Sequence, residues 1–197
     1  MSYANTGMRY PVWAKLNSHT DGSEPTYGTG RVLQEAIEAT ITFNADTNNV
    51  LCGDDLVLDV DDGINGYNVT FNPTGLKDAD RQDMLGEEVT TGSVYEITDA
   101  GSPWGGFGYF RVMRDDNRTR YYEAVWCRKI KFREPSQTTR TKEGSIQWRT
   151  PTLEGVGVGL IVDGSDNVKY IKHKTFDSAS AAKTWLNTQA NISAVTT

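Results

Sequence analysis

The chain has 197 residues, a mass of 21.8 kDa and a formal charge of −6 at pH 7. Its 37% hydrophobic and 23% charged residues are typical of an ordinary soluble globular protein, with one domain or one domain and an appended piece. No apolar run approaches the ~20 residues of a membrane span, and the N-terminal segment has no apolar centre, so neither a membrane helix nor a secretory signal is expected. The two cysteines, Cys52 and Cys127, lack metal-ligand spacing and predict free thiols in a reducing compartment.

Strand-like alternation begins near the N-terminus. Residues 10–16 are predicted to form a strand, and a loop rich in Gly, Ser and Pro follows at 17–30. Residues 35–44 alternate between apolar and polar side chains, which predicts a half-buried strand. Its predicted inward face holds Ile37, Ala39, Ile41 and Phe43. Its predicted outward face holds Glu38, Thr40 and Thr42.

An acidic stretch comes next. Residues 55–61 alternate so that Asp59 and Asp61 share a polar face, and residues 66–71 form a further candidate strand. The turn between these strands resembles a calcium-binding loop. Such a loop needs glycine at its sixth position, whereas Gly63 is the fifth residue counted from Asp59. An acidic turn is therefore predicted in preference to a metal site.

The middle of the chain predicts a helix and then a hairpin. The helix is expected within residues 72–88 and is stopped by Gly86. The hairpin is expected at residues 106–132, with its turn at residues 115–117. The segment GGFG at 105–108 opens a strand, whereas a dinucleotide-binding fingerprint opens a helix. Its glycines are therefore predicted to be sites of close backbone approach.

The second arm of this hairpin carries many cations. Its predicted inward face holds Tyr122, Ala124, Trp126, Ile130 and Phe132. Its predicted outward face holds Glu123, Lys129, Lys131 and Arg133, and Arg128 adds another charge. Charge is also distributed unequally between the two halves of the chain. Residues 1–100 carry 5 Lys+Arg and 17 Asp+Glu, and residues 101–197 carry 15 Lys+Arg and 9 Asp+Glu. Charges of −12 and +6 suit either a polyanion or the opposite half of a neighbouring copy.

The C-terminal segment predicts a second hairpin and a final helix. Residues 157–163 and 168–176 are its two expected strands, and the helix over 177–190 is capped by Asp177 or Ser178. The expected docking face of the helix holds Ala182, Trp185 and Leu186. A change in composition near residue 155 divides the chain into a main β domain, 1–155, and a hairpin-plus-helix extension, 156–197, packed on the same domain.

Catalytic residues are scarce. His19 lies in a polar loop and His173 among lysines, and no motif of a nucleophile or a zinc site surrounds either residue. We therefore expect no enzyme, no cofactor and no metal. The acidic composition and the inward-facing aromatic residues also disfavour a nucleic-acid groove, which ranks behind an interface and behind a simple solvated face.

Several segments, taken in order, resemble one known family. They are YGTGRVL, ATITFN, LCGDD, MLGEE, the long stretch 108–155 around the hairpin, and the closing KTFDSASAAKTWL. From Tyr10 to Leu186 the chain resembles the major tail proteins of long, non-contractile-tailed bacteriophages (siphophages). The one departure is the stretch within residues 50–72, which is longer or more acidic than the resemblance leads us to expect.

The resemblance implies a mainly β fold, an antiparallel β-sandwich or partial barrel with a flanking helix. It implies hexameric rings that stack into a tail tube, with strands joining a β-barrel between subunits and DNA passing through the channel without sequence-specific binding. It further implies a location in the virion tail after assembly in the host cytoplasm. The implied partners are further copies of the chain, the tape measure protein, the tail terminator and the distal tail protein, with no membrane.

Two sets of residues follow as candidate sites. The candidates for contacts between subunits are Arg128, Lys129, Lys131, Arg133, Arg140 and Lys142. The candidates for the channel wall are Glu38, Asp59 and Asp61. The alternative function is a surface-binding β-sandwich for carbohydrate or host surface, which would use an exposed Trp104 or Trp148.

Overall fold

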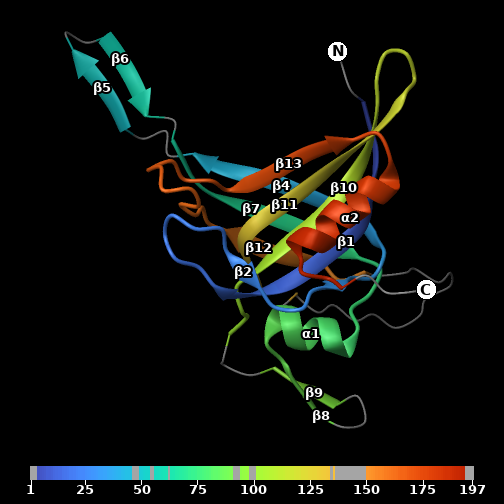
Figure 1. Cartoon of the computed structure of the whole chain (residues 1–197). Helices are drawn as coiled ribbons and strands as arrows, with labels where there is room; N and C mark the ends of the chain where they lie inside the picture. The colour runs from blue at the N-terminus through green and yellow to red at the C-terminus, as the bar shows by residue number, and fades with distance from the viewer. Residues whose placement is uncertain are drawn as a thin grey trace, which may run out of the picture.

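Figure 1 shows the computed structural model of the chain, which describes residues 4–45, 49–53, 56–61, 63–90, 94–97, 101–133, 135 and 150–193. The fold is mainly β with one antiparallel sheet, as the sequence predicts. The sheet is not closed into a barrel, and a helix flanks it.

The large sheet has nine strands. They are β1 (Ala4–Ser18), β2 (Thr26–Tyr27), β3 (Arg31–Val32), β4 (Ala36–Ala45), β7 (Ile64–Pro73), β10 (Gly105–Arg114), β11 (Arg120–Phe132), β12 (Leu153–Gly157) and β13 (Ile171–Phe176). Their spatial order is β2-β1-β10-β11-β12-β7-β4, with β3 beside β1 and β13 beside β11. The strand β4 therefore forms one margin of the sheet.

Two small hairpins stand apart from the large sheet. The first pairs β5 (Asn49–Gly53) with β6 (Leu56–Asp61) and projects away from the body (Figure 1). The second pairs β8 (Glu88–Thr90) with β9 (Val94–Glu96) and follows α1 (Asp78–Leu85). The helix α1 ends at Gly86, whose φ of 76° is the left-handed conformation that glycine adopts without strain, so the predicted stop is confirmed.

The large sheet buries both of its faces over β1, β10 and β11. Alternation along β1 sends Trp13 into the larger core cluster and Val12 into the smaller one. The larger cluster also contains Met84 from the C-terminal end of α1. The smaller cluster is covered by the C-terminal helix α2 (Ala179–Gln189), which the hydroxyl of Ser178 caps by accepting the amide N–H of Ala181.

The predicted docking face of the C-terminal helix and the predicted glycine positions are confirmed. In α2, Ala182 and Leu186 are buried, and Trp185 is half-buried against Phe176. A side chain added at Gly105 would lie 2.3 Å from the ring of Trp13, and the corresponding distance from Gly106 to the ring of Trp126 is 2.2 Å. The glycines of GGFG therefore let two tryptophan rings lie directly on the backbone of β10.

The predicted inward face of β11 is wrong in one respect. Tyr122, Ala124 and Trp126 belong to the cluster under α2, whereas Ile130 and Phe132 belong to the larger cluster on the other face. The reason is a β-bulge, since the register with β10 shifts between Cys127 and Ile130. One extra residue reverses the alternation beyond that point.

The second predicted hairpin is also wrong. Its two segments meet only at an isolated bridge between Leu160 and Lys169, because β13 pairs with β11 and β12 pairs with β11 and β7. The predicted boundary at residue 155 consequently falls inside β12. The C-terminal segment completes the main sheet, and a division of the chain at this residue would cut that sheet.

Candidate subunit interface

The cations predicted for subunit contacts occupy three different environments. Arg128 is buried, with 5% of its surface exposed, and its guanidinium forms an ion pair with Glu24 of the same chain. Its carbonyl oxygen accepts the hydroxyl of Tyr27 at 2.6 Å. Because Arg128 is enclosed and paired within its own chain, the prediction that it contacts a neighbour is wrong.

Glu24 holds the loop 17–30 against the sheet. It accepts a hydrogen bond from Arg128 and another, at 3.2 Å, from the ammonium of Lys172. Partial burial alone would raise the pKa of the Glu24 carboxyl, but these hydrogen bonds and positive charges outweigh it and lower the pKa. A lowered pKa in the folded state means that this contact stabilises the fold above the ordinary carboxyl pKa and is lost as the pH falls through the lowered value.

We expect Glu24→Gln to lower the free energy of unfolding by about 1–3 kcal/mol near neutral pH, because it leaves a buried guanidinium without its carboxylate. The value should lie at the low end of that range, since the Glu24 side chain is 55% exposed and solvent screens the pair. Urea unfolding near neutral pH measures this loss of stability, and urea unfolding near pH 3 tests whether the difference between the two proteins disappears in acid. The matched control is Glu96→Gln at an exposed position. Equal stability of the two variants near neutral pH would contradict the assignment.

Lys129 lies over the ring of Trp104, with its ammonium 5.1 Å from the ring centroid. Both side chains are half-buried, so Trp104 is not the open aromatic platform that the surface-binding alternative requires. Its other proposed aromatic residue, Trp148, lies outside the described residues, as do Arg140 and Lys142.

Lys131 and Arg133 lie at the free end of β11. The neighbouring strand β10 stops at Gly105, opposite Ile130, so on that side residues 131–133 have no neighbouring strand in the described part of the chain. On the other side they pair with β12, and the Arg133 amide donates to the carbonyl of Glu154 at 2.8 Å. Neither Lys131 nor Arg133 forms an ion pair with any described residue.

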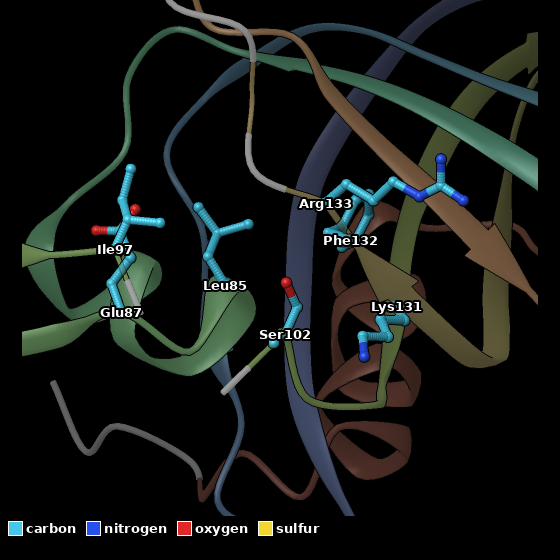
Figure 2. Close-up of a pocket in the computed structure, with 8 residues that line it drawn as sticks. Leu85, Glu87, Ile97, Ser102, Lys131, Phe132 and Arg133 are labelled. Carbon is cyan, nitrogen blue, oxygen red and sulfur yellow. The ribbon is translucent and has the colours of Figure 1, made fainter. Parts of the chain in front are cut away.

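A pocket of about 280 Å³ opens beside this strand end (Figure 2). It is lined by Leu85, Glu87, Ile97, Gly101, Ser102, Lys131, Phe132 and Arg133. In Figure 2, Glu87 and Ile97 lie on one side, the two cations lie on the other, and Leu85 and Ser102 lie between them. The pocket therefore has an apolar interior, and Lys131 and Arg133 lie along one wall.

Glu87 is the residue in this pocket that the sequence did not single out. Only 3% of its surface is exposed, and its Oε1 accepts a hydrogen bond from Arg81 at 2.9 Å. Its Oε2 is buried and has no hydrogen-bond partner among the described residues. One acid among 26 carries no signal of burial, so only the fold identifies it.

The channel candidates are separated by the fold. On β4 the predicted polar face is confirmed, because its residues lie opposite polar residues of β7 in the pairs Glu38–Asn72, Thr40–Thr70 and Thr42–Asn68. This open face continues across β12 to Lys131, which lies opposite Val156. Asp59 and Asp61 belong to the projecting hairpin β5–β6, so they do not join Glu38 on the open face.

The marginal strand β4 differs from its prediction at Ile37. A register shift between Ala36 and Glu38 leaves Ile37 without a partner on β7, and this residue is 63% exposed in place of facing inward. Phe43 packs on Tyr67 as predicted for the inward face, with ring centroids 6.2 Å apart, although it remains 47% exposed. Together, β4, β7, β12 and the end of β11 form a four-stranded region with an open edge on each side.

Neither helix in the described residues is long and apolar enough to cross a membrane, and no three metal-ligating side chains of those residues gather at one point. Searches against protein-family models and against curated proteins gave no match.

Proposed function

We propose that this protein is a structural virion protein, the major subunit of a phage tail tube. In this proposal it polymerises into hexameric rings that stack around a channel for DNA. The resemblance of the sequence to siphophage major tail proteins supports this function. The structural observation that carries it is the four-stranded region with one open edge on β4 and another at residues 131–133.

Two different open edges suit a ring. Contact between unlike surfaces is heterologous, and it closes into a ring or continues as a filament. The strands β4, β7, β12 and β11 alternate in direction, so the β4 strand of a rotated copy meets the end of β11 in antiparallel orientation. Closure in this way joins the sheets of all subunits and removes edges that would otherwise promote aggregation.

The open face of this region is the proposed channel wall. It bears the neutral side chains of Thr40, Thr42, Asn68 and Thr70, with the acids Glu38 and Glu154 and with Lys131 at one margin. A wall of neutral hydroxyl and amide groups with few cations gives DNA phosphates little to bind, so the duplex can slide.

We expect the purified protein to form rings or tubes with no metal and no nucleotide added. The measurement is negative-stain electron microscopy together with sedimentation velocity, with and without EDTA. A strictly monomeric protein at high concentration would contradict the proposal, and a monomer that binds glycans would support the surface-binding alternative. Tubes that EDTA dissolves and calcium restores would contradict assembly without metal.

A further inference from the structure

The pocket beside the end of β11 has an apolar interior that favours binding of an apolar side chain. Its interior is formed by Leu85, Phe132 and Ile97, and Ile97 is 59% exposed. An exposed apolar surface of this kind is stabilised when another apolar group covers it. A suitable occupant therefore brings an apolar side chain.

The opposite edge of the same four-stranded region carries such a group. Ile37 on β4 is 63% exposed and lies in a bulge, where the extra residue is left out of the ladder with β7. It therefore offers an uncovered isoleucine side chain at the margin of the sheet.

The charges around the two features are opposite. Glu35 and Glu38 flank Ile37, and both are exposed. Lys131 and Arg133 line one wall of the pocket and form no ion pair with the described residues. An apolar side chain between two carboxylates thus faces an apolar pocket beside two cations.

We propose that the pocket of one copy holds Ile37 of the next copy, with Glu35 and Glu38 paired to Lys131 and Arg133 across the seam. This inference rests on the proposed tube function and names the residues of its lateral contact. Glu38 and the two cations share the open face of the sheet, so their pairing is compatible with a channel wall on that face.

The test uses two charge-reversed variants of the full chain. The first is Glu35→Lys with Glu38→Lys, and the second is Lys131→Glu with Arg133→Glu. Alone, each variant places like charges across the seam, so neither should form rings. Mixed in equal amounts they should assemble, because every seam of an alternating ring again joins opposite charges. The matched control for the second variant is Lys174→Glu with Lys183→Glu, two exposed lysines on β13 and α2, which should assemble like the unaltered protein.

The apolar contact is tested separately. Ile37→Ala should raise the protein concentration needed for assembly roughly tenfold or more, because most of a buried isoleucine side chain is lost from the seam. Val32→Ala removes a side chain that is 41% exposed on β3 and should leave the threshold unchanged.

Circular dichroism and thermal melts confirm that each variant folds. If the unaltered protein never assembles, the proposed function fails. If it assembles and both charge-reversed variants also assemble alone, or if their mixture does not, the tube stands and the pairing of Ile37 with this pocket is overturned.

Discussion

Replacing Trp126 by alanine is expected to lower the free energy of unfolding by about 3–5 kcal/mol. Only 1% of the Trp126 surface is exposed, and its ring packs edge-on against Tyr27 with centroids 5.3 Å apart. The ring lies directly on Gly106 and Gly108 of β10, and it shares the smaller core cluster with Leu186 of α2. Removing it opens a cavity where the backbone is least able to close, because β10 is held by strands on both sides.

Urea denaturation measures this loss as a lower transition midpoint with an unchanged slope. The matched control is Trp185→Ala, since Trp185 is only half-buried, against Phe176 beside the smaller cluster, and its loss should cost less. A loss below about 1 kcal/mol for Trp126→Ala would contradict this packing of the ring against β10 and Tyr27.

The second large effect concerns the channel. Asn68→Lys together with Thr70→Lys is expected to leave tube assembly intact and to slow DNA passage more than tenfold, because cations repeated around every ring hold the phosphates. Both residues are exposed on the open face of β7, away from the two proposed seam edges. Release of DNA from assembled particles, measured at increasing salt, should recover as the charge contact is screened.

The control for this experiment is Thr184→Lys with Thr188→Lys at two exposed positions of α2, which adds the same charge on the helix that packs over β10 and β11. Equal slowing by both variants would show that added charge acts on the particle generally. If the β7 variant does not slow DNA passage, the open face does not line the channel.

Local signals in the sequence predicted the elements well. The stop at Gly86, the cap at Ser178 and the close approach at Gly106 all depend on one residue and its immediate neighbours, and all three are confirmed. Alternation also predicted the strands that became β1, β4, β10 and β11.

The errors have a common physical cause, which is that long-range pairing is not encoded in local patterns. A bulge reverses alternation, and so Ile37 is exposed and β11 changes faces after Cys127. Arg128 pairs with Glu24, which is 104 residues away in sequence, and no rule based on local spacing indicates such a pair. The strand β13 pairs with β11 across the fold, which replaced the local hairpin that its turn residues predicted.

Chemical labelling of the buried Cys127 thiol reports opening of the fold. The residue is 0% exposed, and burial raises its pKa to about 12, the hydrogen bond with Tyr67 offsetting only part of that rise. Alkylating reagents attack the thiolate, so they find almost none at neutral pH and cannot reach it while the core is closed. The rate at which Cys127 is labelled therefore measures how often a subunit opens. The same rate can be measured for a free subunit and for a subunit within an assembly.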